Sequence, residues 1–259
     1  MIRRDMRCDG RDGWALIAQP AHARLAGDLV RNWNDAWFPL VEPLDEFTAA
    51  VDRHDDGWIA WETRPTVVDG RPRNFLEMPI DESLAIWRRS IAVAQTIGPL
   101  AAFAVGGHFA SLADRAEHRE PHSPAWCDLV DEFLDEQRTL RTERLAQLRR
   151  TPQEDVGEAE RRARRGMRLL QLFDTLSLWF CCREVPEGAR FELPDGGEKL
   201  DLRHLEPGRA TVEPWPFRPR ELQIRTEALW LPATPLNGPE DLARVEKRPL
   251  VMQWTLVAA

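Results

Sequence analysis

The sequence predicts an α+β protein that is mainly α-helical, and two patterns support this fold class. Apolar residues recur with the helical period from Pro20 to about Cys182, whereas from Gly188 onward they alternate with polar residues and are separated by turns. The chain has 259 residues, of which 43% are hydrophobic, enough for one core with a co-packed region. We therefore expect a helical domain with an all-helical core over residues 1–187 and a β region over residues 188–259 that packs against it.

Capping residues and prolines indicate where the first two helices begin and end. A strand over residues 14–18 leads into a helix that begins at Pro20, a residue suited to the first turn because no helical partner exists there for an amide hydrogen. The second helix is expected to begin at Asp45, whose carboxylate can cap free amides, and to end near Gly57. The stretch from Pro65 to Pro79 is expected to be a loop.

Longer helices are expected to follow. A very apolar helix should run from Glu82 to about Arg115, interrupted at Gly106-Gly107, where the missing side chains allow another element to approach closely. Two further helices are expected over residues 126–149 and 154–182. The helix over 126–149 is rich in charges of both signs, so we expect its charged half to project into solvent.

The last part of the chain predicts an antiparallel sheet. Its alternating segments are bounded by proline-rich turns, which limit the lengths of the strands because proline cannot donate a ladder hydrogen bond. The apolar face of this sheet is expected to pack on the helices. The predicted strands are Phe191–Leu193, Thr211–Phe217, Leu222–Leu231 and Leu250–Val257.

Composition excludes several classes of partner. The formal net charge is −8, so the chain gains no general affinity for nucleic-acid backbones, and we expect no nucleic-acid partner. No stretch is apolar enough to span a bilayer, and the charged amino terminus lacks the apolar core of a secretion signal. The four cysteines form no CxxC pair, which fits a reducing compartment. We expect a cytoplasmic protein of undetermined oligomeric state that acts on a small anionic molecule.

Ionisable side chains interrupt the apolar stripes at a few positions. A buried charge without a partner is costly, so such residues usually acquire a partner or a metal. Each has an ordinary alternative, because a buried histidine can be a hydrogen-bonded core residue and a buried aspartate can pair with arginine. Together, imidazole and carboxylate groups without a thiolate suit one or two manganese, iron, zinc or cobalt ions. The predicted metal ligands are His22, His54, Asp55, His108 and Asp174.

The order of these residues resembles the ligand pattern of the HD-domain superfamily of metal-dependent phosphohydrolases. That pattern has a lone His on one helix, an adjacent His-Asp on the next and a final Asp on a later helix, matched here by His22, His54-Asp55 and Asp174. The resemblance implies an HD-like helical bundle in which these four residues bind a first metal. It also implies that Asp55 bridges to a second ion, which His108 would help to hold.

A second resemblance covers nearly the whole chain. The segments from Gly13-Trp14 to Gly27, from Ala50 to Trp58, and at Gly107-His108 resemble an uncharacterised bacterial family of unknown function. That family supplies no activity. Function is therefore expected from the superfamily resemblance, which implies hydrolysis of a small phosphorylated or nucleotide-like substrate by metal-activated water.

Residues near the His-Asp pair are candidates for contact with the substrate. Glu62 follows Asp55 by seven residues and is predicted to act as a general base or to orient water, with a solvent-facing carboxylate as the alternative. Trp58 and Trp61 could form aromatic walls, although core packing explains them equally well. Arg64 and Arg168 are candidates to bind anionic groups of the substrate, with a solvated charged surface as the alternative.

Two other functions stay open at this point. Some HD-like proteins are diiron oxygenases that use four histidines, and here the fourth would have to be His118 or His122, in a polar loop. The other alternative is a protein that binds a metal or ligand without catalysis. Trp58 stands where some phosphodiesterases of the superfamily have a lysine, so those enzymes are poor guides.

Overall fold

The computed structural model describes residues 1–117, 123–149, 155–182, 188–194 and 196–259. Its largest element is a seven-stranded sheet in the order β1-β2-β8-β9-β7-β6-β5. The strands are β1 (Ile2–Cys8), β2 (Arg11–Ile17), β5 (Ala189–Glu192), β6 (Lys199–Glu206), β7 (Arg209–Glu213), β8 (Glu221–Pro232) and β9 (Arg248–Ala258), and a separate small hairpin joins β3 (Val67–Val68) to β4 (Arg71–Pro72).

Helices occupy most of the first 182 residues. The bounds are α1 (Gln19–Asn32), α2 (Leu44–Arg53), α3 (Ile59–Glu62), α4 (Ile80–Ile97), α5 (Pro99–Glu117), α6 (Pro124–Leu148), α7 (Val156–Cys182) and α8 (Pro239–Arg244), with short 3-10 turns at Asp56–Trp58 and Phe75–Glu77. In the parts of the chain that the structure describes, none of them has the length and apolarity needed to cross a membrane.

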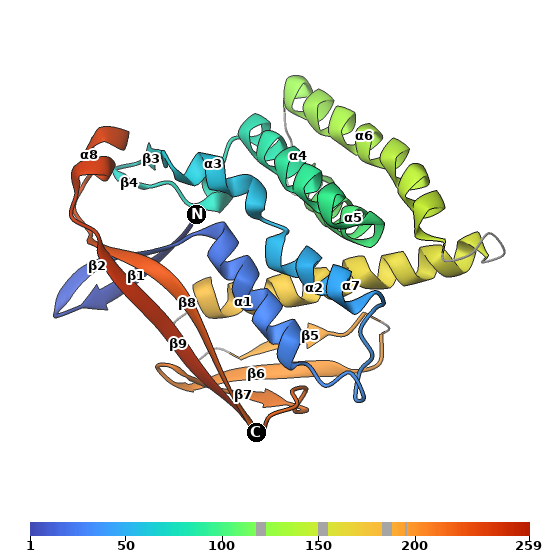
Figure 1. Cartoon of the computed structure of the whole chain (residues 1–259). Coiled ribbons are helices and arrows are strands. Elements are labelled where there is room, and N and C mark those ends of the chain that lie inside the picture. The colour runs from blue at the N-terminus through green and yellow to red at the C-terminus, as the bar shows by residue number, and fades with distance from the viewer. Residues whose placement is uncertain (118–122, 150–154, 183–187, 195) are drawn as a thin grey trace.

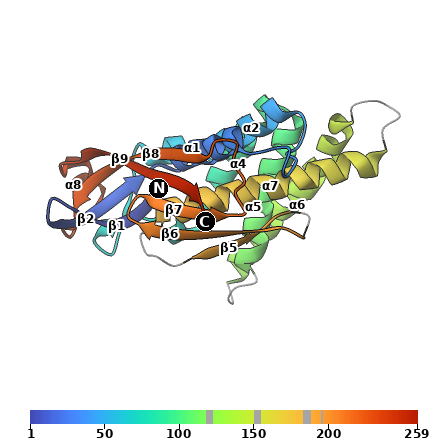
Figure 2. The same cartoon turned by 90° about the horizontal axis from the view of Figure 1, so that it is seen from below.

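The helices form two levels on the sheet. Helices α1 and α7 contact strands β8 and β1 respectively, and α4, α5 and α6 pack on one another farther away (Figures 1 and 2). One hydrophobic core joins the levels, because it includes Leu25 of α1, Phe173 of α7, Phe109 of α5 and Ile224 of β8. Helices α1 and α7 are therefore buried on two sides, and polar residues on them must be satisfied internally.

The expected HD-like helical bundle with a C-terminal antiparallel β region is wrong. The sheet begins at the amino terminus, where β1 and β2 form a hairpin whose second strand pairs with β8, and it contains a parallel pair, β7 with β9. The sequence pattern did not indicate strand β1, because charged residues occupy several of its positions and no alternation of apolar residues is evident. The structure places Arg3 in a salt bridge with Glu77 at 2.9 Å, while Ile2 is fully buried.

The expectation of an all-helical core is also wrong. Strand residues such as Leu202, Ile224 and Trp254 belong to the same buried cluster as the helical residues. The helices alone therefore do not enclose the core, since α1 and α7 need the sheet to cover their outer faces. The other predicted strands are confirmed in substance, because β5, β7, β8 and β9 overlap the alternating segments, while β6 was missed.

The long apolar helix breaks at a different place than expected. It ends at Ile97 and restarts at Pro99, whereas Gly106-Gly107 stay helical within α5. Proline lacks the amide hydrogen that a continuous helix needs. Glu46 then caps the new helix, because its Oε1 accepts hydrogen bonds from the amides of Leu100 at 2.7 Å and Ala101 at 3.1 Å. The helices predicted over 126–149 and 154–182 are confirmed as α6 and α7.

Candidate metal centre

His22 projects inward from the first turns of α1. Only 1% of its surface is exposed, and its Nδ1 lies 2.9 Å from the Ser177 hydroxyl oxygen of α7. That hydroxyl donates its hydrogen to the carbonyl of Asp174 at 2.8 Å, so its oxygen must accept the hydrogen of His22 Nδ1. The other ring nitrogen, Nε2, faces Asp55 Oδ2 at 2.8 Å. The two atoms lie within hydrogen-bond distance of each other.

His54 ends helix α2 and is oriented in the same way. Its Nδ1 donates to the carbonyl of Val51 at 2.8 Å, which directs Nε2 toward the carboxylates. Nε2 lies 3.3 Å from Asp174 Oδ1 and 3.5 Å from Asp55 Oδ2. Both histidines therefore present Nε2 to the same place while the protein backbone and a serine hold Nδ1, an arrangement found in metal-binding histidines.

The two carboxylates come from different elements. Asp55 follows His54 as the chain leaves α2, and Asp174 lies in the middle of α7 among apolar residues. His22, His54 and Asp174 each offer one ligand atom, and these atoms lie within 4.8 Å of one another. Ligand atoms about 2.1 Å from a common ion lie roughly 3–4 Å apart, so a small inward shift of the side chains would let all three atoms reach one ion.

Charges within the cluster are strongly coupled. Burial lowers the pKa of His54, but Asp55 and Asp174 outweigh that effect and raise it to about 9. Burial raises the pKa of Asp174, but the hydrogen bond from His54 and the charges of the histidines bring it well below its ordinary value, and the pKa of Asp55 is lowered in the same way. Both carboxylates are therefore ionised at neutral pH, and a metal would take the place of the His54 proton.

His108 approaches the cluster from α5. Its ring centroid lies 5.6 Å from that of His54, and burial lowers its pKa to about 4, so the ring is neutral at physiological pH. Its Nδ1 is buried and has no hydrogen-bond partner among the described residues. A buried, neutral imidazole with an unpaired nitrogen fits a further metal ligand.

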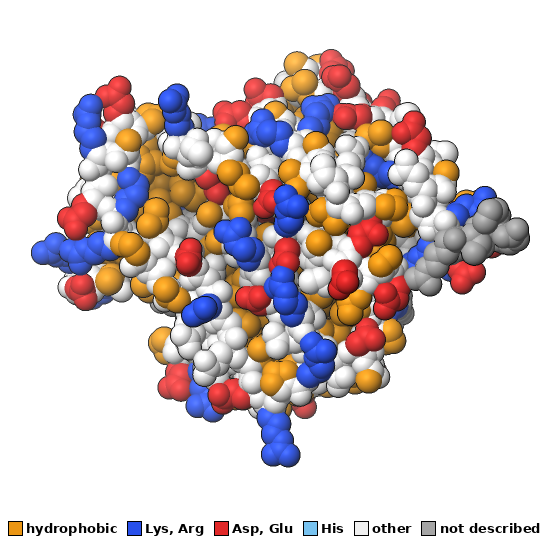
Figure 3. All heavy atoms as spheres, in the orientation of Figure 1, with side chains coloured by type: hydrophobic (Ala, Val, Ile, Leu, Met, Phe, Trp, Pro, Cys, Tyr) orange, Lys and Arg blue, Asp and Glu red, His pale blue; other side chains and the backbone are white. Residues whose placement is uncertain are grey.

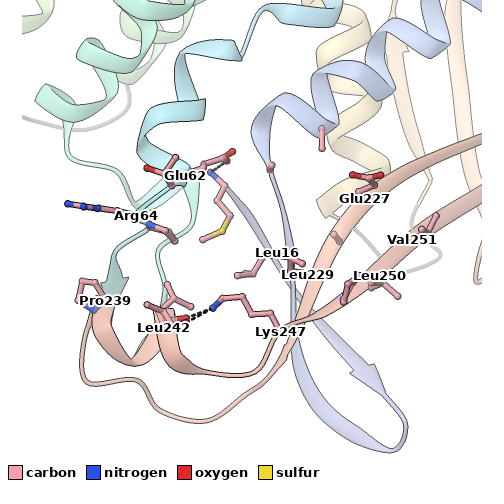
Figure 4. Close-up of a pocket in the computed structure, with 18 of the residues that line it drawn as sticks. Leu16, Glu62, Arg64, Glu227, Leu229, Pro239, Leu242, Lys247, Leu250 and Val251 are labelled. Atoms are coloured by element: carbon pink, nitrogen blue, oxygen red, sulfur yellow. Dashed lines mark hydrogen bonds and ion pairs between the residues drawn. The ribbon is translucent and has the colours of Figure 1, made fainter.

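Four of the predicted ligands thus come together, with His108 packed beside His54, whereas the predicted substrate residues lie apart from them. Glu62 and Arg64 line a cavity of about 960 Å³ between the end of α3, the start of α1, α8 and strands β8 and β9 (Figure 4). This region is visible as a hollow with hydrophobic lining at the upper left of Figure 3. None of the five ligands lines this cavity, although Ala21, the neighbour of His22, does.

Glu62 is engaged in holding chain segments together. Its Oε1 accepts a hydrogen bond from the backbone amide of Gln19 at 2.8 Å and lies 3.0 Å from the amino nitrogen of Met1. Gln19 is the first residue of α1, three residues before His22. Glu62 therefore helps to fix the start of the helix that carries the first histidine.

Trp58, Trp61 and Arg168 lie elsewhere. Trp58 is buried and packs edge-on against Trp61 at 5.6 Å between ring centroids, and the indole nitrogen of Trp61 donates to Glu82 at 3.0 Å. Neither tryptophan lines the large cavity, so both serve as packing residues. Arg168 lines a separate groove beside residues 40–42. His118 and His122 lie outside the described residues.

Sequence reasoning missed Ser177, which orients His22. The signal was present, because Ser177 is a polar residue three positions after Asp174 on the same buried stripe.

The family model described as "Protein of unknown function (DUF3891)" matches residues 1–233 of the chain. The chain belongs to the DUF3891 family.

The other comparisons give this DUF3891 protein no relative of known activity. No curated protein and no solved structure matches the chain. The match confirms the expected membership of an uncharacterised family, and it does not extend to the HD-domain superfamily. The geometry of the His/Asp cluster is therefore the basis for the function of this DUF3891 protein proposed below.

Proposed function

We propose that the protein is a hydrolase that depends on a divalent transition metal held by His22, His54, Asp55 and Asp174. The observation that carries the proposal is the orientation of the two histidines. Each has Nδ1 fixed by a protein group and Nε2 directed at ionised carboxylates within 3.3 Å. Imidazole and carboxylate ligands without thiolate favour manganese, iron, cobalt or zinc.

A catalytic centre also needs a position that water and substrate can reach. Asp174 is the most exposed of the five residues, at 9%, and Asp55 follows at 5%, while the histidines lie deeper. The carboxylate side of the cluster is therefore the side from which a substrate would approach. A bound metal would lower the pKa of a coordinated water and polarise an oxygen of the substrate.

The reaction class comes from the order of ligands along the chain. A lone His, an adjacent His-Asp and a later Asp is the pattern that resembles the HD phosphohydrolases, and the proposal takes from it the substrate class, a small phosphorylated or nucleotide-like molecule, and not the fold. Glu62 has no general-base role in this proposal, because its Oε1 already accepts from Gln19 and faces Met1. Asp55, which contacts His22 and His54, would orient the attacking water.

The first experiment is elemental analysis of the purified protein beside Asp55→Ala and Asp174→Ala. Wild type is expected to carry or rebind a stoichiometric divalent metal that both folded variants lose. Asp56→Asn is the matched control, because Asp56 is adjacent in sequence but its carboxylate pairs with Arg53 at 2.8 Å. Failure of wild type to retain or rebind any metal would exclude the proposal.

The second experiment measures release of phosphate from a panel of phosphomonoesters and phosphodiesters by the metal-loaded protein. Turnover that disappears in Asp174→Ala and persists in Asp56→Asn is expected. Two bound irons without phosphate release would instead favour the oxygenase, for which the unpaired Nδ1 of His108 offers a ligand to a second ion. A bound metal without either activity would indicate a metal-binding protein.

A further inference from the structure

A second cavity lies between α5, α6 and α7, and the five metal ligands do not line it. Its volume is about 290 Å³, at the lower end of the range for small-molecule sites, roughly 300–1,000 Å³. Helix α5 contributes Gly106 and Gly107, α6 contributes Gln137 and Arg144, and α7 contributes Met167. His108 follows Gly107 directly but its ring packs against His54, so the two sites use different faces of α5.

Arg144 is the unusual residue in this cavity. It is 5% exposed, and its guanidinium makes one hydrogen bond among the described residues, from Nη1 to Gln137 Oε1 at 3.3 Å. In the part of the chain that the structure describes, its Nε and Nη2 are buried without a partner, as is Nε2 of Gln137. Three buried donors that line one cavity therefore have no acceptor among these residues.

The glycines of α5 make room for this guanidinium. A Cβ atom at Gly106 would lie 2.3 Å from Nη1 of Arg144, and one at Gly107 would lie 2.4 Å from the sulfur of Met167. The expected close approach at Gly106-Gly107 is thus confirmed, although the helix is not interrupted there. The absence of a side chain at Gly106 thus allows the charged guanidinium of Arg144 to lie in the interior between the helices.

The other arginines of the cavity already have carboxylate partners. Arg138 pairs with Asp135, and both Arg141 and Arg164 pair with Glu160. Asp114 also lines the cavity. Arginine does not give up its proton in proteins, so Arg144 remains a buried charge; Glu136 and Glu143 act on it electrostatically but accept no hydrogen bond from its Nε or Nη2. A buried guanidinium of this kind is expected to bind an anion.

We propose that this cavity binds the phosphate group of a small molecule. The free edge of a guanidinium, Nε with one terminal nitrogen, matches two oxygens of a phosphate, and Nε2 of Gln137 supplies a third donor. Three donors suit a tetrahedral oxyanion better than a carboxylate, which has two oxygens. The cavity leaves space for the organic part of the ligand beside the phosphate.

Binding of inorganic phosphate to the metal-free protein tests this assignment. The melting temperature is measured in chelator while phosphate replaces chloride at constant ionic strength, with acetate as a parallel anion. Wild type is expected to show a saturable increase with phosphate and little change with acetate. Removal of the metal keeps the outcome independent of the proposed hydrolase, because phosphate then has no ion to bind at the other site.

Substitutions of Arg144 identify the donor. Arg144→Met is expected to weaken phosphate binding by about tenfold or more, because it removes charge-assisted hydrogen bonds, and to melt no lower than wild type without phosphate. Arg144→Lys, which keeps the charge but loses the planar fork, should bind with intermediate affinity. Arg225→Met is the control, since Arg225 is an exposed residue of β8 with the same charge.

Three results would overturn the proposal. The first is a wild-type melting temperature that responds to phosphate no more than to chloride. The second is a phosphate response that is equal in wild type and Arg144→Met. The third is acetate binding as tight as phosphate binding, which would make the cavity a carboxylate site.

Discussion

At the scale of single residues, the hydrogen bond at Nδ1 decides which atom of each histidine can bind an ion. Ser177 and the Val51 carbonyl fix this choice for His22 and His54. Sequence reasoning selected the five residues of this region because each is a polar residue on an apolar stripe. It did not predict Arg144, because α6 carries charges of both signs throughout and its charged half was expected to face solvent.

Removing the Ser177 hydroxyl tests the role of this orienting group. Ser177→Ala leaves all metal ligands in place but frees His22 to rotate, so metal affinity is expected to fall about 10- to 100-fold. Thr175→Ala is the control, because Thr175 is an exposed residue of α7 whose hydroxyl bonds to the backbone of Gln171. Titration with zinc against a competing chelator measures both. Equal affinity of the two variants would contradict this role for Ser177.

Buried His108 predicts a pH dependence of the metal-free protein. Its folded pKa of about 4 lies below the unfolded value of 6.5, so the unfolded chain binds the proton more tightly. Stability is therefore lost as pH falls from 6.5 toward 4, by about 3 kcal/mol at pH 4 from this group alone. His108→Gln should show a shallower loss in urea unfolding over that range. His54, whose pKa is raised to about 9, stabilises the folded protein below pH 6.5, and this contribution is lost as pH rises from 6.5 toward 9.

At the scale of elements, the junction between α4 and α5 shows why helix breaks are hard to place from sequence. Gly98-Pro99 and Gly106-Gly107 are both breaking signals, and only the first ends a helix. The deciding residue is Glu46, which lies 52 positions before Gly98 in the chain and caps α5. Local pattern cannot reveal a cap from so distant a segment.

Loss of that cap should destabilise the protein. Glu46→Ala leaves the amides of Leu100 and Ala101 without their acceptor, which typically costs about 1 kcal/mol. Glu46→Gln keeps a carbonyl oxygen in place and should cost less. The free energy of unfolding in urea distinguishes the variants, and an unchanged value for Glu46→Ala would show that water replaces the cap.

At the scale of the whole molecule, the sheet joins the beginning of the chain to its last strands. The amino-terminal hairpin pairs with β8 through β2, and β8 pairs with β9. Strand order and the parallel pairing of β7 with β9 depend on contacts between distant segments, so periodicity alone did not predict them. The sequence predicted which segments pack and not how the strands are ordered.

This connectivity predicts a single cooperative unfolding transition. The core includes both helical and strand residues, so neither residues 1–187 nor 188–259 should melt alone. Far-ultraviolet circular dichroism and tryptophan fluorescence are expected to give coincident curves. Gly13→Val should shift both curves to lower denaturant together, because a Cβ there would lie 2.5 Å from the Leu231 carbonyl oxygen. Two separated transitions would establish independent domains.

The position of β9 also bears on how the protein is made. This strand follows every other element in the sequence, yet it lies between β8 and β7 in the middle of the sheet. Translation proceeds at about 5–20 residues per second. The edges of β8 and β7 that pair with β9 therefore stay unpaired until residues 248–258 leave the ribosome. A released chain truncated after residue 233 would therefore expose two open edges and be prone to aggregate or recruit chaperones.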